Sequence, residues 1–191
     1  SPCARERHNA MCGIAGIYQQ NGHRVSLELV ETMGNLTYHR GPDNFSFLGF
    51  DEHLGLSHNR LSFLDLSSAA NQPFKNDDYA LVYNGEIYNF RELRSQLEKN
   101  HGVSFNTTSD TEILFYSLIH DGIENCLKKI QGMFAFAFYD KVKGELWLAR
   151  DRLGIKPLYY TQKDTAVFEF GLFEKRHADK IVGAQRNIFP G

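Results

Sequence analysis

Residues 133–139 constrain the fold most strongly, because both faces of the strand that they predict are apolar. Aromatic residues alternate with mostly small ones, in the order Phe134, Ala135, Phe136, Ala137, Phe138 and Tyr139. This period of two is typical of a β-strand, and a strand that is apolar on both faces has to be covered on both sides. Small residues on one face and bulky ones on the other favour a second sheet on one side, with helices outside.

The other predicted elements place helices between two groups of strands. Apolar runs and alternation predict strands at 12–18, 45–50, 54–61, 79–83, 145–149, 158–162 and 166–170. Apolar stripes with a period near 3.6 predict helices at about 26–38, 89–100, 109–118 and 123–130. Because strands and helices do not alternate regularly, the fold class is α+β rather than a doubly wound parallel sheet.

Three of the helices begin at residues that are good N-caps. Asn89 with Glu92, and Ser109 with Glu112, match the capping box, in which the glutamate three residues after the cap bonds back to it. Ser26 is a third cap. The apolar stripe of the helix that follows Ser26 is predicted to be Leu29, Val30, Met33 and Leu36.

Composition excludes several classes of partner and compartment. The 191 residues carry a net charge of -2 without a basic run, so binding to nucleic acid or to a membrane surface is not indicated. The apolar run at 133–139 is too short to span a bilayer, and no secretory signal is recognisable. Cys3, Cys12 and Cys126 are few, odd in number and far apart, which favours a reducing compartment and predicts a cytoplasmic location.

Cys12 is the first candidate for chemistry, because it directly follows Met11 at the start of a predicted strand. If Met11 and everything before it were removed, Cys12 would carry both a thiol and a free α-amine. That amine can act as the general base for the thiol, as it does for N-terminal threonine nucleophiles. The alternative is that Cys12 is a small buried apolar residue.

Six short motifs together carry a family resemblance. They are Met11-Cys12-Gly13-Ile14-Ala15-Gly16, His39-Arg40-Gly41-Pro42-Asp43, His58-Asn59-Arg60-Leu61-Ser62, Asn84-Gly85-Glu86-Ile87-Tyr88-Asn89, Ser109-Asp110-Thr111-Glu112 and the run from Asp151 to Tyr160. In this order, the chain over about residues 11–170 resembles the glutaminase domain of glutamine-dependent asparagine synthetases. That domain is a class II glutamine amidotransferase of the N-terminal-nucleophile hydrolases. The resemblance implies a four-layer αββα sandwich.

The resemblance also implies that glutamine is hydrolysed through a γ-glutamyl thioester on Cys12. The side-chain N–H of Asn84 and the backbone N–H of Gly85 match the family's oxyanion hole, which stabilises the charge that amide attack creates. Taken alone, Asn-Gly is a strong hairpin-turn signal, so a plain turn is the competing interpretation.

Three charged residues match the family's glutamine-binding positions. Arg60 would grip the α-carboxylate of glutamine through two parallel hydrogen bonds, although a lone arginine is more often part of a surface ion pair. Asp110 would receive the α-ammonium group, with Glu86 nearby. Asp110 also lies where a carboxylate stabilises a helix N-terminus, and the two roles are compatible.

No spacing of His and Cys residues indicates a metal site, and no cofactor is expected in this domain. We expect a leader, tag or propeptide at 1–11, the amidotransferase domain at 12–171, and an uncertain tail at 172–191 where a synthetase domain would begin. The Ser-Gly-Gly-x-Asp-Ser run of the synthetase part does not occur in this sequence. The partner is therefore expected to be a synthetase domain or subunit that receives ammonia, and ATP and magnesium are expected only there.

Two other functions remain open at this stage. With Met11 still attached, the amide nitrogen of Cys12 is not a base, and the chain would be a non-catalytic glutamine-binding or regulatory domain. The ammonia acceptor could also differ from aspartate.

Overall fold

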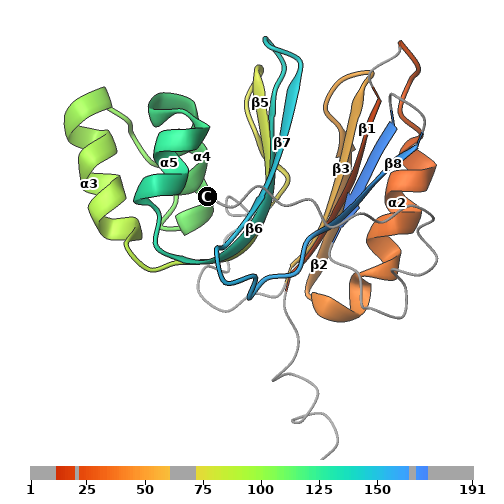
Figure 1. The fold of residues 1–191 in the computed structure, drawn as a ribbon, viewed down its shortest axis with the longest axis horizontal. Helices are drawn as coiled ribbons and strands as arrows, with labels where there is room; N and C mark the ends of the chain where they lie inside the picture. Colours follow the sequence, from red (N-terminus) through yellow and green to blue (C-terminus); the bar gives the residue numbers. More distant parts are fainter. Residues whose placement is uncertain (1–11, 20–21, 61–71, 164–166, 172–191) are drawn as a thin grey trace, which may run out of the picture.

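The computed structural model describes residues 12–19, 22–60, 72–163 and 167–171. Two antiparallel sheets pack face to face, with helices on both outer sides, so the layers run α, β, β, α as expected (Figure 1). The first sheet has the order β2 (Asn44–Gly49), β3 (Leu54–Arg60), β1 (Gly13–Gln19), β9 (Val167–Gly171) and β8 (Tyr159–Lys163). The second has the order β4 (Phe74–Lys75), β5 (Tyr79–Ile87), β6 (Gly132–Asp140) and β7 (Glu145–Arg150).

Strand β6 lies between two apolar layers, which confirms the prediction from its alternation. Its phenylalanines face the helical layer, in one core cluster with Leu114 of α4 and Leu93 of α3. Its Ala135, Ala137 and Tyr139 face the first sheet. The helices of this layer are α3 (Phe90–His101), α4 (Asp110–Asp121) and α5 (Ile123–Lys129).

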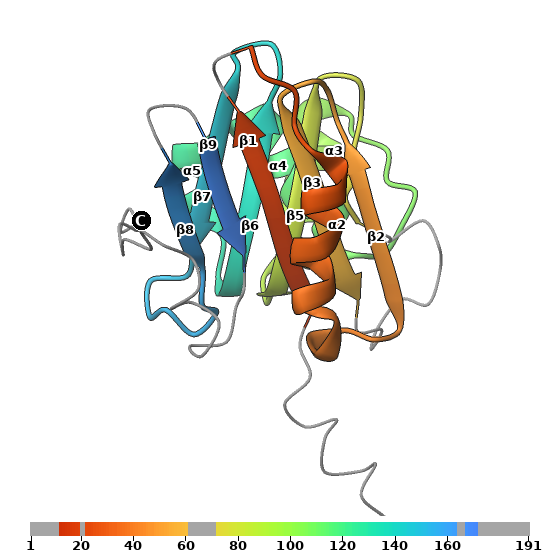
Figure 2. The same cartoon turned by 90° about the vertical axis from the view of Figure 1, so that its right-hand side faces the viewer.

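The opposite outer face is covered by α2 (Leu27–Leu36), which lies across β1 and β3 (Figure 2). Ser26 caps this helix as predicted, since its hydroxyl accepts a 3.2 Å hydrogen bond from the Leu29 N–H. The predicted apolar stripe of this helix is correct for Val30 and Met33 and wrong for the other two residues. Leu29 and Leu36 are 43% and 48% exposed, because the sheet contacts a narrower face of the helix. That face consists of Val30, Met33 and Gly34.

The two capping boxes were predicted alike but differ in the structure. Asn89 makes no side-chain cap; its Oδ1 accepts from the Gln131 N–H, and its Nδ2 donates to the Lys129 carbonyl. Asn89 is the N-cap residue of α3 as predicted, but the capping box is wrong, because the Asn89 amide bonds the backbone around Ile130 instead.

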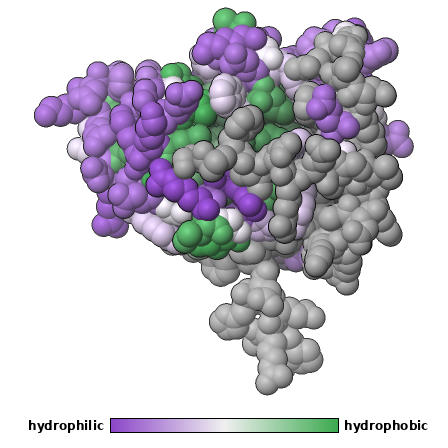
Figure 3. Space-filling view, in the orientation of Figure 1, coloured by the Kyte–Doolittle hydropathy of each residue, from purple (hydrophilic) through white to green (hydrophobic). Residues whose placement is uncertain are grey.

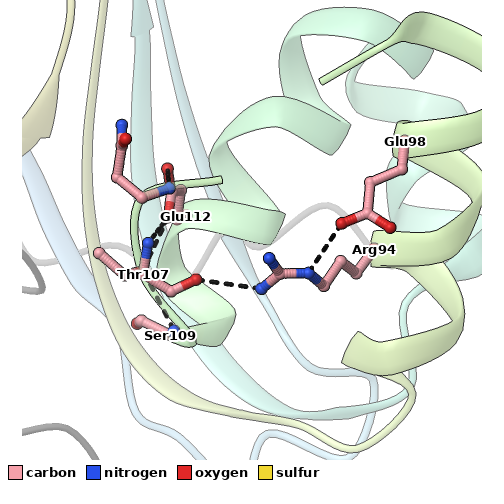
Figure 4. A network of polar contacts seen from close by, with 6 residues as sticks. Arg94, Glu98, Thr107, Ser109 and Glu112 are labelled. Atoms are coloured by element: carbon pink, nitrogen blue, oxygen red, sulfur yellow. Dashed lines mark hydrogen bonds and ion pairs between the residues drawn. The ribbon is translucent and has the colours of Figure 1, made fainter. Parts of the chain in front are cut away.

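Ser109 does cap α4, but Glu112 does not close the box onto Ser109. The Glu112 carboxylate, which is fully buried, accepts instead from the N–H groups of Asn106 and Thr107 and from the Thr107 hydroxyl (Figure 4). The Glu112 carboxylate therefore holds the loop that precedes α4, and not the cap residue Ser109.

Asn84-Gly85 is not a turn. Both residues lie inside the nine-residue strand β5, opposite Ala135 and Phe134 of β6. Strand β4 was not predicted, because two residues carry too little alternation to be recognised. The segments 1–11 and 172–191, for which we predicted a leader and a tail, lie outside the described residues. Within the ranges that the structure describes, none of the helices combines the length and the apolar character needed to cross a membrane.

Candidate active site

The candidate residues of the first sheet come together at one end of it. Cys12 directly precedes β1, and β1 runs antiparallel to β3 with Gly13 opposite Asn59. This register places Cys12 beside the end of β3 that carries Arg60. Ile14 and Leu56 face the second sheet, and side chains alternate along strands, so Arg60 belongs to the same inner face.

Strand β5 supplies the facing wall. Ala80 and Val82 point into the core between the sheets, so alternation turns Asn84 and Glu86 toward the same gap. Strands β1 and β3 both contact β5 across this gap. The candidate residues of the two sheets therefore meet at the same end of the sandwich.

Asn84 carries a buried side-chain donor of the kind that an oxyanion hole requires. Its side chain is only 4% exposed, and its Nδ2 has no hydrogen-bond partner among the described residues. Buried polar atoms are nearly always paired, so an unpaired one indicates either an absent ligand or a functional role. A donor held in place before the reaction is what stabilises developing negative charge.

Gly85 is required by packing between strands. A side chain there would overlap the Met133 carbonyl oxygen, and its Cβ would lie 2.7 Å from the Cα of Phe134. The close approach that this glycine allows in the structure is to β6.

Asp110 begins α4 and is linked to β5 by two hydrogen bonds. Its Oδ2 accepts from the Tyr83 hydroxyl at 2.7 Å and from the Ile87 N–H at 3.0 Å. Burial raises the pKa of Asp110, and the charge of Glu86 raises it further, while these hydrogen bonds oppose the rise. Two carboxyl groups thus act on each other at this end of β5, as a site for an ammonium group requires.

His58 is a neutral side chain in this region. Burial lowers the pKa of His58 to about 3, and the nearby Arg60 charge contributes in the same direction. At neutral pH the imidazole therefore carries no charge, while the half-buried Arg60 supplies a cation next to it.

Only one of the two described cysteines is suited to act as a nucleophile. Burial raises the pKa of Cys126 to about 12, so this thiol in α5 stays protonated. Cys12 is half-buried at the end of the gap, and its charge contributes to the raised pKa of Tyr83. Neither forms a disulfide, and Cys3 lies outside the described residues.

Sequence patterns alone did not identify Tyr83, Gln72 and His58 as neighbours of the candidate site residues. Alternation along β5 predicts that Tyr83 points away from Asn84, and nothing local shows that α4 brings Asp110 to the Tyr83 hydroxyl. Among the described residues, no group of three or more His, Cys, Asp or Glu side chains could hold a metal ion.

Comparisons with known proteins identify the family of this chain. The family profile described as "Glutamine amidotransferase domain" matches residues 11–176. Asparagine synthetase [glutamine-hydrolyzing] 1 of Bacillus subtilis is 41% identical over 165 residues, which is 83% of this chain and 25% of that protein. Amidase chry2 of Gibberella zeae is 37% identical over 164 residues, which is 79% of this chain and 24% of that protein. The chain thus spans about a quarter of the length of these relatives.

A solved structure has the same fold at low sequence identity. It is the glutamine phosphoribosylpyrophosphate amidotransferase from B. subtilis complexed with ADP and GMP, with a TM-score of 0.71 at 23% identity, over 91% of this chain and 44% of that one. The family match covers most of the sequence, and the fold agrees with it. The chain belongs to the glutamine amidotransferase domain family.

Proposed function

We propose that this chain hydrolyses glutamine to glutamate and ammonia, with Cys12 as the nucleophile. The observation that carries the proposal is the buried Nδ2 of Asn84, which has no hydrogen-bond partner among the described residues and lies at the same end of the sandwich as Cys12. An amide donor kept without a protein acceptor is matched to the oxyanion of acyl transfer.

The reaction needs Cys12 with a free α-amine. The amine takes the thiol proton, and the thiolate attacks the side-chain amide carbon of glutamine. The oxyanion that forms is stabilised by Asn84 Nδ2 and by the Gly85 N–H. Collapse of this intermediate breaks the C–N bond, and the ammonium group of Cys12 returns its proton to the leaving ammonia. Water then hydrolyses the thioester and releases glutamate and the thiol.

The charged side chains suit the two ends of a zwitterionic substrate. Arg60 binds the α-carboxylate, for which a planar guanidinium offers two parallel donors. Asp110 and Glu86 receive the α-ammonium group. Burial raises the pKa of Asp110 and the Glu86 charge adds to the rise, and an ammonium group bound between these two carboxylates would relieve their repulsion.

The ammonia acceptor is proposed to be a synthetase part, fused or separate, which would also hold ATP and magnesium. Support comes from the B. subtilis relative, in which the matched region is a quarter of the protein. Leu153 and Ile155 are 86% and 52% exposed on the loop after β7, a surface suited to docking. Figure 3 also shows an apolar patch at the lower rim of one face of the molecule. The proposed location is the cytoplasm.

The acceptor need not be aspartate. One relative bears the name amidase, which keeps a different acceptor as a second candidate. Acceptor assays would distinguish the two once the rest of the protein is present.

The test compares glutamine hydrolysis by the chain as given and by the chain that begins at Cys12. We expect activity in the second version, loss of activity in its Cys12→Ala variant, and a γ-glutamyl adduct on Cys12 by mass spectrometry. Hydrolysis that survives Cys12→Ala would overturn the proposal. Glutamine binding without hydrolysis in either version would instead indicate the non-catalytic recognition domain.

A further inference from the structure

Tyr83 occupies the position directly before Asn84 but contributes to the other side of the sheet. Its side chain is 3% exposed and belongs to the core between β5 and the helices, together with Ile87 and Leu114. The strand therefore presents the oxyanion donor on one face and a buried phenol on the other. None of the glutamine-binding roles proposed above uses this phenol.

The backbone of Tyr83 is held by the side chain of Gln72. The Tyr83 N–H donates to Gln72 Oε1 at 2.6 Å, and Gln72 Nε2 donates to the Tyr83 carbonyl at 3.0 Å. Gln72 Nε2 also lies 3.4 Å from Thr111 Oγ1, in the first turn of α4. One buried amide thus ties β5 to the start of α4, and the direction of the Tyr83 side chain is set by this clamp.

With its side chain in this direction, the Tyr83 phenol contacts Asp110. The Tyr83 hydroxyl donates to Asp110 Oδ2 at 2.7 Å, next to the donation from the Ile87 N–H. Burial raises the pKa of Tyr83 well above its usual value, and the charges of Asp110, Glu86 and Cys12 add to the rise. The phenol therefore stays protonated and remains a donor throughout the working pH range.

We propose that Tyr83 is a positioning residue of the glutamine site, which orients the Asp110 carboxylate toward the substrate ammonium group and stabilises its negative charge. This inference rests on the proposed function, because it assigns the ammonium group to Asp110. It adds a residue that does not touch the substrate but determines how well a substrate-binding residue performs.

The Tyr83 hydroxyl is important for the Asp110 charge, because other features of the site disfavour that charge. Glu86, on β5, repels the Asp110 charge, and burial disfavours that charge further. Against these effects stand the phenol, the Ile87 N–H and the backbone of Thr111. Arg94 of the neighbouring α3 is occupied by Glu98 and by the Thr107 carbonyl. Removal of the phenol should therefore raise the pKa of Asp110.

The variant Tyr83→Phe tests the inference in the chain that begins at Cys12. We expect the inhibition constant of glutamate to rise about tenfold, since a hydrogen bond to a charged group is lost. The inhibition constant of glutarate, which lacks the ammonium group, should not change. The acid limb of kcat/KM should move to higher pH, because Asp110 would be protonated more easily.

Tyr79→Phe is the matched control. Tyr79 lies on the same strand and packs against the same core cluster, stacked on Phe138 at 5.6 Å between ring centroids. This variant should leave both inhibition constants and the pH profile unchanged.

Equal weakening of glutamate and glutarate by Tyr83→Phe, or an unmoved acid limb, would overturn the inference and leave the proposed function intact. Absence of hydrolysis by the unmodified chain would instead overturn the proposed function. If Tyr83→Phe does not fold, 3-fluorotyrosine at position 83 provides a second test. Its more acidic phenol is a stronger donor, so the acid limb should then move to lower pH, and an unmoved limb would again contradict the inference.

Discussion

Two buried asparagines differ in how their side-chain amides are hydrogen-bonded. Asn59 Nδ2 donates to the Gly34 carbonyl and to Thr37 Oγ1, both at 2.7 Å, and so connects β3 to the end of α2. Asn84 Nδ2 is also buried but has no partner among the described residues. The first amide joins two elements of the fold, whereas the second is the proposed oxyanion donor.

Asn84→Ala should therefore lower kcat with little loss of stability, and Asn59→Ala should lower stability with little loss of kcat. Asn84→Ala should lower kcat by about 10²- to 10³-fold, as removal of an oxyanion donor does. It should change the free energy of unfolding by less than about 1 kcal/mol, because no protein hydrogen bond of Nδ2 is lost. Asn59→Ala should cost about 1–3 kcal/mol of stability and leave kcat of the folded protein unchanged. Steady-state kinetics and urea denaturation measure both quantities, and a stability loss without a kinetic effect in Asn84→Ala would contradict the assignment.

At the scale of the element, the start of α4 determines where Asp110 lies. The Glu112 carboxylate accepts three hydrogen bonds from Asn106 and Thr107, and the Thr107 carbonyl in turn accepts from Arg94 of α3 (Figure 4). This network fixes the loop that leads into the helix, and with it the first turn that carries Asp110.

Glu112→Gln should lower the free energy of unfolding by about 2 kcal/mol, because the new NH₂ group would face donors. Glu92→Gln is the matched control, since Glu92 also lies three residues after an N-cap but is exposed, and it accepts a hydrogen bond from the side chain of Gln96. It should change stability by less than about 0.5 kcal/mol. Chemical denaturation of both variants measures the difference, and equal effects would show that the buried network is not what stabilises the loop.

At the scale of the whole molecule, His58 is a neutral side chain buried in the sandwich. Its folded pKa of about 3 lies below the ordinary value of 6.5, because burial and the Arg60 charge disfavour protonation. The unfolded chain therefore binds a proton at this residue that the folded protein excludes. His58 thus favours folding above pH 6.5, and this contribution is lost as the pH falls from 6.5 toward 3.

His58→Gln should make the stability of the sandwich less sensitive to acid. Between pH 6.5 and 5 the parent protein should lose about 2 kcal/mol more than the variant, since one proton taken up on unfolding costs about 1.4 kcal/mol per pH unit. Urea denaturation across this range measures the slopes. His23→Gln, at an exposed position, is the control and should keep the parent slope. Equal slopes in all three proteins would show that His58 is not buried in the neutral form.

The sequence by itself determined the layers of this protein and the composition of its candidate site. Alternating residues at 133–139 predicted a strand covered on both faces, because side-chain direction in a strand is set by local backbone geometry. Six ordered motifs placed Cys12, Arg60, Asn84, Gly85, Glu86 and Asp110 in one proposed site. The structure brings most of these residues to one end of the sandwich, while their roles stay predictions.

Tertiary structure decided what depended on contacts between distant segments. Asn84-Gly85 became part of a strand rather than a turn, because β6 pairs with it along its whole length. Glu112 and Asn89 bonded distant partners instead of completing capping boxes. The contact between Tyr83 and Asp110 joins residues 27 positions apart across two elements. No local pattern encodes such a contact, because it exists only once α4 has packed onto the sheet.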